Sequence, residues 1–175
     1  QKPTGLKGDL QFSLVDAADS HIDFNNKLVD SDSVNFLENQ YVYIGSGVGV
    51  GDFNQDGLQD LFFAGAQADS KLYINKGGLE FEDITETSGI IKNKWSTGVS
   101  VVDINNDGRP DIYVCVTNYK NPEQRRNLLY INKGNLHFSE EAKAYGLDDP
   151  GYSTQAAFFD YDKDGDLDCF IINHS

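Results

Sequence analysis

One nine-residue pattern constrains the fold of this 175-residue chain more than any other feature. The pattern Asp-x-(Asn or Asp)-x-Asp-Gly-x-x-Asp occurs three times, at residues 52–60, 103–111 and 160–168. An apolar segment precedes each copy, at 44–51, 95–102 and 152–159, and another follows it, at 61–64, 112–115 and 169–172. Units that recur at a fixed period stack on one another as copies of one supersecondary structure. We therefore expect the chain to fold as a row of related units.

A second hairpin follows in two of the repeats. Residues 71–77 and 128–134 share the sequence Leu-Tyr-Ile-Asn-Lys-Gly, and a short alternating segment follows each, at 79–81 and 136–138. Asn-Lys-Gly is typical of a tight turn, because glycine tolerates positive φ. Four short strands in a repeat of about 50 residues predict an all-β fold built from β-propeller blades.

The repeat boundaries predict a partial β-propeller over residues 1–175. Repeat 1 spans residues 40–90, repeat 2 spans 91–147, and the first half of repeat 3 spans 148–175. Residues 8–13 match 134–139, so residues 8–39 are predicted to hold the last strand of a preceding blade and a long connection. About three repeats make an incomplete ring, since propellers typically need about four to eight blades, and we expect this chain to be part of a longer propeller.

Two segments are longer than the repeat requires. Residues 21–38 add 18 residues to the connection before repeat 1, and residues 118–126 hold six residues that repeat 1 lacks. Binding residues are often found on such loops. Tyr119, Arg125 and Arg126 are therefore candidates for partner contacts. The alternative is an ordinary solvated loop in which Arg126 pairs with nearby acidic groups.

The repeated pattern places oxygen-bearing side chains at alternate positions of a tightly curled loop, so that they converge on one point. The glycine at its sixth position (Gly57, Gly108 and Gly165) permits the sharp turn. The seventh position varies in type, as expected if it contributes only its backbone carbonyl. The candidate ligands in the three loops are Asp52, Asn54, Asp56, Leu58 and Asp60; Asp103, Asn105, Asp107, Arg109 and Asp111; and Asp160, Asp162, Asp164, Asp166 and Asp168.

An all-oxygen, carboxylate-rich site favours Ca²⁺ over Mg²⁺, which keeps its water ligands. An EF-hand is excluded, because its twelfth position needs Glu and here holds Phe63, Val114 or Ile171. A plain hairpin turn would explain one copy of the pattern but not three copies in register. We therefore predict about three Ca²⁺ sites, and the third should bind most tightly because its loop has four ligand carboxylates where the others have three.

The charge of the chain narrows its range of partners. Its 28 acidic and 14 basic residues give a formal net charge of −14. That excess argues against nucleic acid and anionic membrane surfaces as partners. No apolar run approaches the roughly 18 residues that a membrane helix needs, so direct membrane insertion is not expected. Cys115 and Cys169 show no CxxC pattern; we expect two small buried strand residues, with a Cys115–Cys169 bridge as the alternative.

Residues 50–61 resemble the calcium loop of FG-GAP/VCBS-type repeats, which form propellers in integrin α chains and many bacterial surface proteins. Residues 95–98, 126–130 and 151–155 are more similar to bacterial proteins of the ASPIC/UnbV and cartilage-acidic-protein group. The resemblance covers roughly residues 40–175. It implies a propeller of seven or eight blades, extracellular calcium and an exported or outer-membrane-associated location in a bacterium, but it implies no single activity.

Three functions remain open at this point. A calcium-stabilised binding or adhesion module with a protein or carbohydrate ligand is the leading hypothesis, because structural metal loops need no catalytic groups. A structural subunit of a larger surface assembly is the second. A fragment of a carbohydrate-active or hydrolytic enzyme is the third, and it is disfavoured because His21, His137 and His174 are scattered and no catalytic motif is present. We therefore expect no enzymatic activity.

The large aromatic residues of the repeats are expected in the cores of the blades rather than on a sugar-stacking surface. This expectation concerns Phe53, Phe62, Trp95, Tyr152 and Phe159.

Overall fold

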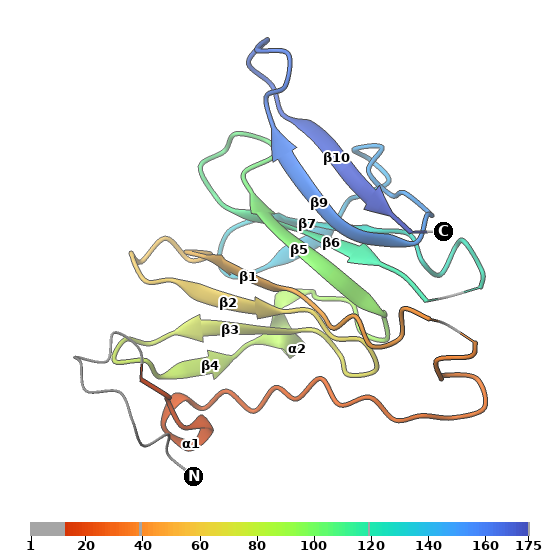
Figure 1. Cartoon of the computed structure of the whole chain (residues 1–175). Helices are drawn as coiled ribbons and strands as arrows, with labels where there is room; N and C mark the ends of the chain where they lie inside the picture. The colour runs from red at the N-terminus through yellow and green to blue at the C-terminus, as the bar shows by residue number, and fades with distance from the viewer. Residues whose placement is uncertain (1–12, 39, 119, 175) are drawn as a thin grey trace, which may run out of the picture.

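The computed structural model describes residues 13–38, 40–118 and 120–174, and their regular secondary structure is almost entirely β-strand (Figure 1). They form two four-stranded antiparallel sheets and one two-stranded hairpin. This arrangement confirms the prediction of four strands in each complete repeat. The strands of the first sheet are β1 (Val48–Gly51), β2 (Asp60–Phe63), β3 (Lys71–Asn75) and β4 (Phe81–Asp83). Those of the second are β5 (Ser96–Val102), β6 (Asp111–Val116), β7 (Leu128–Asn132) and β8 (Phe138–Glu140). The hairpin consists of β9 (Ser153–Phe159) and β10 (Asp168–Asn173).

Helix is limited to two single turns among the described residues. These are α1 (Ala17–Ser20) and α2 (Thr85–Ser88), and α2 lies in the connection between the first two sheets. No helix of the described residues is long and apolar enough to cross a membrane.

The three sheets are stacked like blades, with their first strands β1, β5 and β9 side by side (Figure 1). One polar contact recurs between neighbouring blades. The Ser46 hydroxyl donates to the Ser96 carbonyl over 2.9 Å, and at the same position of the next repeat the Thr97 hydroxyl donates to the Ser153 carbonyl over 2.8 Å. The blades therefore associate through one repeated geometry, and the ring that they begin is not closed.

The second sheet is buried on both faces, because it lies between the first sheet and the hairpin. All six residues of β6 are buried. Ile112, Val114 and Val116 pack into the core shared with the first sheet. Tyr113 and Cys115 point the other way, into the core shared with β9 and β10. Alternation along one strand thus supplies two separate cores.

The added segment at residues 21–38 runs along the face of the first sheet that points away from the second (Figure 1). Asp23 binds Lys71 at 2.8 Å and accepts a hydrogen bond from the Tyr73 hydroxyl at 2.6 Å. The Phe24 ring stacks on Phe63 with centroids 5.1 Å apart. The predicted strand at residues 8–13 lies outside the described residues, apart from Ser13, which is in no strand.

The prediction that the large aromatic residues are buried in the blade cores is confirmed for some of them only. Phe53, Phe62 and Trp95 are buried, with at most 6% of their surface exposed. Phe159 is 45% exposed, so the prediction for this residue was wrong. It lies on the face of β9 that points away from the second sheet, and no described strand covers that face. Cys115 is buried and Cys169 is half-buried, and both are free thiols.

Glycine permits the closest approach between the first two blades. A Cβ atom at Gly49 would lie 2.8 Å from Val99 Cγ1 and 2.9 Å from Val101 Cγ2. These distances are too short for carbon atoms, so the two valines pack directly against the backbone of β1. Gly49 is therefore required by packing and not by its backbone conformation.

We expect Gly49→Val to destabilise the fold by about 1–3 kcal/mol, because it overfills this interface. Val48→Ile is the control: Val48 is 50% exposed on the other face of β1, and the change there should stay within about 0.5 kcal/mol. Urea unfolding measures both values. Adding Val99→Ala to Gly49→Val should recover part of the loss, and equal destabilisation with and without that second change would contradict the packing argument.

Candidate metal centre

The three aspartate-rich loops occupy the same position in successive blades. They join β1 to β2, β5 to β6 and β9 to β10, and they lie at one edge of the stacked sheets (Figure 1). Each follows the first strand of its blade, so the stacking that aligns β1, β5 and β9 also aligns the loops.

The loops share one backbone conformation. The sixth position has positive φ in each loop, with 89° at Gly57, 83° at Gly108 and 97° at Gly165, as the sequence predicted. The fourth position is also left-handed, although it holds Gln55, Asn106 and Lys163, which the pattern gave no reason to single out. Left-handed residues at two fixed positions curl the chain tightly enough to bring its first and ninth residues together.

The aspartate at the first position organises the turn. In the first loop, the Asp52 carboxylate accepts hydrogen bonds from the backbone N–H groups of Asp56, at 3.0 Å, and Gly57, at 2.8 Å. Asp103 makes the same two bonds in the second loop, at 3.0 and 2.7 Å. These first-position carboxylates therefore stabilise the loop conformation through hydrogen bonds that need no bound cation.

The aspartate at the ninth position ties the loop to the following hairpin. Asp60 is fully buried, and its two oxygens accept from Phe53 N and Asn75 N, both at 2.8 Å. In the second loop, Asp111 is also fully buried and accepts from Ile104 N at 3.1 Å and Asn132 N at 2.8 Å. Burial raises the pKa of both Asp60 and Asp111, and the other aspartates of each loop add to the effect.

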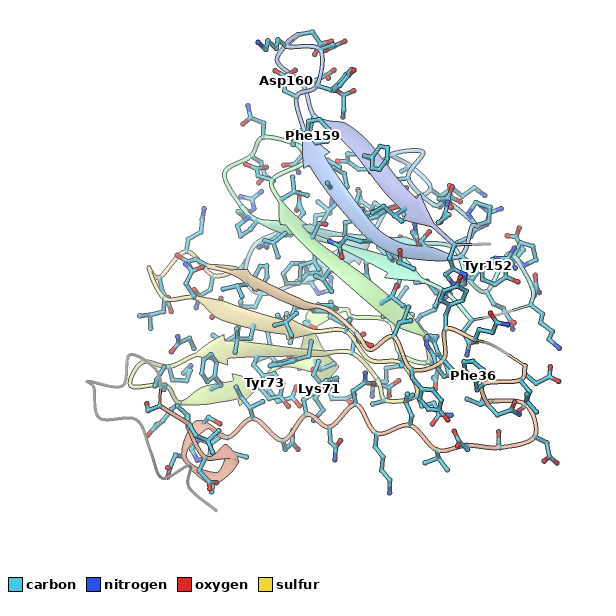
Figure 2. All side chains as sticks on the ribbon, viewed as in Figure 1. Phe36, Lys71, Tyr73, Tyr152, Phe159 and Asp160 are labelled. Carbon is cyan, nitrogen blue, oxygen red and sulfur yellow. The ribbon has the colours of Figure 1, made fainter. Side chains whose placement is uncertain are left out.

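The third loop brings its carboxylates closest together. Oxygen atoms of Asp160, Asp162 and Asp168 all lie within 4.8 Å of one another, which is the spacing that several ligands of one cation require. Among the described residues, no other group of three acidic, histidine or cysteine side chains meets this condition. Figure 2 shows Asp160 at the far end of β9, where the loop projects from the sheets.

The first two loops differ at the third position, which holds an amide. The Asn54 amide donates to the Asp56 carboxylate at 2.8 Å, and the Asn105 amide donates to Asp107 at 3.0 Å. An amide oxygen remains a suitable ligand for a hard cation. The donor sets of all three loops therefore fit an oxygen-coordinated cation, and the third loop carries the most negative charge.

The second loop contains a positively charged side chain, Arg109. The Arg109 guanidinium lies 2.7 Å from the Asp107 carboxylate and also donates to the Asn132 carbonyl at 3.1 Å. The pKa of Asp107 lies below its usual range, mainly because the backbone N–H of Arg109 donates to this carboxylate. The Arg109 guanidinium lowers the pKa further. A metal ion in this loop would compete with Arg109 for one carboxylate.

The predicted contact residues separate into different roles. Tyr119 lies outside the described residues. Arg126 pairs with Glu123 at 2.8 Å and Asp148 at 2.9 Å, so it fastens its loop to the chain, as the alternative reading held. Arg125 donates to the Pro150 carbonyl and lies over the Tyr152 ring, with Cζ 4.2 Å from the centroid.

Sequence reasoning missed an aromatic cluster at the other end of the strands. The ring of His174 lies between Tyr41, at 3.8 Å, and Tyr152, at 5.3 Å, measured between centroids. Tyr152 was expected in a blade core but is only half-buried. One sequence signal was present: the position of His174 holds Ala66 and Thr117 in the earlier repeats, so the blade itself does not require an aromatic ring there.

Comparison with known proteins adds a family and two relatives. A family model described as an FG-GAP-like repeat matches residues 52–114 and 115–171. Cartilage acidic protein 1 of Xenopus tropicalis is 30% identical over 132 residues, and the protein of the same name from Homo sapiens is 27% identical over 135. Each alignment covers 74% of this chain but 20% of the relative, so the chain spans about a fifth of the length of the curated relatives it matches.

The two hydrogen bonds that the buried Asp60 carboxylate accepts lead to a prediction that does not depend on bound metal. Asp60→Asn replaces one buried acceptor with an N–H donor that faces a backbone N–H, so we expect a loss of about 2 kcal/mol in the free energy of unfolding. Urea unfolding in the presence of EDTA measures this loss without a contribution from bound cations. Asp32→Asn, at an exposed position, is the control and should have little effect. Equal stability of the Asp60→Asn variant and the parent would contradict the assigned role.

Proposed function

The chain belongs to the FG-GAP-like repeat family, and from that premise we propose that it is a calcium-stabilised, non-enzymatic binding module of an extracellular or cell-surface protein. One observation carries the calcium part of the proposal: three loops with the same left-handed positions lie at the same edge of successive blades, and in the third loop three carboxylates converge within 4.8 Å. The ligands would be the side chains at positions one, three, five and nine of each loop, with the backbone carbonyl of position seven.

Calcium suits these loops for chemical reasons. Their donors are carboxylate and amide oxygens, which hard cations prefer over softer nitrogen and sulfur ligands. Ca²⁺ accepts six to eight such ligands in flexible geometry, whereas Mg²⁺ requires a near-octahedral shell and retains water. Three Ca²⁺ ions would also add six positive charges to a chain whose formal net charge is −14, which would relieve repulsion within the loops.

The role of the metal would be to hold the blade edges rather than to switch the protein. Asp60 and Asp111 are already fixed by backbone N–H groups from two different segments, so most of the loop is organised before a cation arrives. A cation would join the exposed half of the loop, at positions three and five, to this buried anchor. Binding would therefore add stability without a large change of shape.

An extracellular location is part of the same proposal. Loops with exposed ligands resemble calcium sites of extracellular modules, whose affinities of roughly 10⁻⁴–10⁻³ M suit the calcium concentration outside cells. The two matched relatives are named for cartilage, which is consistent with such a location. A bacterial outer-membrane surface is the more specific form of this proposal. The partner would be a protein or carbohydrate ligand or another subunit of a surface assembly.

Calcium should raise the thermal stability of the chain. At a concentration about 100 times the dissociation constant, one site adds about 2.7 kcal/mol, so we expect the midpoint of thermal unfolding to rise by about 5–10 °C over its value in EDTA. Differential scanning calorimetry in CaCl2, in MgCl2 and in EDTA measures the shift, and magnesium should give a smaller one. Identical midpoints of thermal unfolding in calcium and in EDTA would contradict the calcium proposal.

The third loop should bind calcium most tightly, because it has one more ligand carboxylate than the others. Asp162→Asn gives this loop the donor set of the first loop, and we expect the tightest site seen by isothermal titration calorimetry to weaken about tenfold. Asn54→Asp should strengthen the first site in return. Lys163→Arg, which changes no ligand, is the control. A tightest site that is unchanged by Asp162→Asn would show that the ranking is wrong.

A further inference from the structure

A groove lies at the end of the strands opposite the aspartate-rich loops. It consists of two adjoining cavities of about 460 and 480 Å³, which share Tyr41 and His174 in their walls. Figure 2 places Tyr152, in the wall of the first cavity, and Asp160, in the third loop, at opposite ends of β9. The groove is therefore separate from the candidate metal centre.

The parts of the chain that exceed the repeat meet at this groove. The segment at residues 21–38 supplies Leu37 and Glu38, and the enlarged loop at 118–126 supplies Asn118 and Lys120. Lys120 pairs with Glu38 at 3.1 Å, so the two additions contact each other directly. In repeat proteins, insertions often map to loops on the binding face. Two independent insertions that converge on one cavity are difficult to explain by blade architecture alone.

Three aromatic rings form one wall of the groove, and the Arg125 guanidinium, which lines neither cavity, lies over one of them. Tyr41, His174, Tyr152 and Arg125 follow one another, with separations of 3.8 Å, 5.3 Å and 4.2 Å. They come from four distant parts of the sequence. In the preceding repeat, Trp95 holds the position of Tyr152, but it is 6% exposed and packs in a closed apolar cluster. The third repeat thus presents aromatic surface where the second repeat buries it.

The other walls combine polar side chains with a smaller number of apolar groups, which include Ile44 in the second cavity. Ser46, Thr97 and Thr154 hold the same position in the three repeats, and all three line the second cavity beside Gln155. Leu37 is the one aliphatic side chain among the described residues that line the first cavity, which also includes Ser33 and Gln40. Such a mixed lining suits a ligand with both apolar and polar surface.

The charges of the groove do not favour an anion. Lys120 is paired with Glu38, and Arg125 donates to the carbonyl oxygens of Pro150 and Lys120. The formal net charge of −14 would also repel an anionic ligand. Aromatic faces beside hydroxyl and amide groups match the two kinds of surface of a sugar ring, which has C–H faces and a polar rim.

From these observations we infer that the groove around Tyr41, Tyr152 and His174 binds a neutral saccharide. The sugar C–H face would lie against the aromatic surface that these rings leave exposed to the groove, and its hydroxyl groups would meet the polar side chains of the walls. This inference rests on the proposed binding function and assigns it a site and a ligand class. The site is formed by groups that are already packed together, so little ordering would accompany binding.

The test uses the full chain in saturating CaCl2 with cellohexaose, mannohexaose and chitohexaose as neutral probes and hexagalacturonate as an anionic one. Saturation-transfer NMR and isothermal titration calorimetry detect and quantify binding. We expect at least one neutral probe to bind, and we expect Tyr41→Ala and Tyr152→Ala each to weaken it at least about tenfold, the loss of one stacking contact. Tyr145→Ala is the control, because that residue is 40% exposed and lines neither cavity.

Two further variants separate loss of binding from loss of folding. Tyr41→Phe keeps the ring and should bind within about threefold of the parent, while Ser33→Trp, on an exposed part of the added segment, should block the first cavity without touching a blade. Binding that survives both alanine variants, preference for hexagalacturonate, or no binding of any neutral probe would overturn the inference. A calcium-dependent rise in thermal stability together with any of these outcomes would leave the calcium proposal standing and reject the saccharide site alone.

Discussion

The buried carboxylate at the ninth position of each complete repeat is the interaction on which the rest of the structure depends. Asp60 and Asp111 each accept one N–H from their own loop and one from the hairpin that follows. A charged group without solvent is tolerated only when both oxygens are satisfied, so the loop and the hairpin must be in register together. The same contact therefore sets the shape of the candidate metal loop and the alignment of the four-stranded sheet.

The two ends of the stacked strands are built by different rules. At the loop end, the three repeats are similar, since the same positions have the same backbone conformation, and the N–H at position six donates to the carboxylate at position one in every loop. At the opposite end, the repeat-related positions diverge, as Ala66, Thr117 and His174 show. Uniformity is expected where a feature supports every blade, and divergence is expected where one blade acquires a contact that the others lack. This division is the structural reason for proposing a stabilising cation at one end and a ligand-binding groove at the other.

The sequence was sufficient for the features that repeat. A pattern that occurs three times predicts the number of strands, the positions of the loops and the positive φ of Gly57. Each copy supports the interpretation of the other two. The groove did not follow, because repeat alignment does not say where the insertions at 21–38 and 118–126 lie in space. Phe159 was placed wrongly for a related reason: alternation shows that it faces a different side from Phe158, but not whether another sheet covers that side.

The faces by which successive blades meet also show that the blades are not interchangeable. The residues that point from each first strand toward the next blade grow in size along the chain. They are Gly49 and Gly51 in β1; Gly98, Ser100 and Val102 in β5; and Ala157 and Phe159 in β9. Valines of β5 fill the space above the glycines of β1, whereas Ala156 and Phe158 face the larger residues of β5. Since each interface is filled by a particular pair of faces, exchanging two repeats would overfill one interface and leave a cavity in the other. The order of the repeats is thus fixed by packing, although the aspartate-rich loops that they carry are nearly the same.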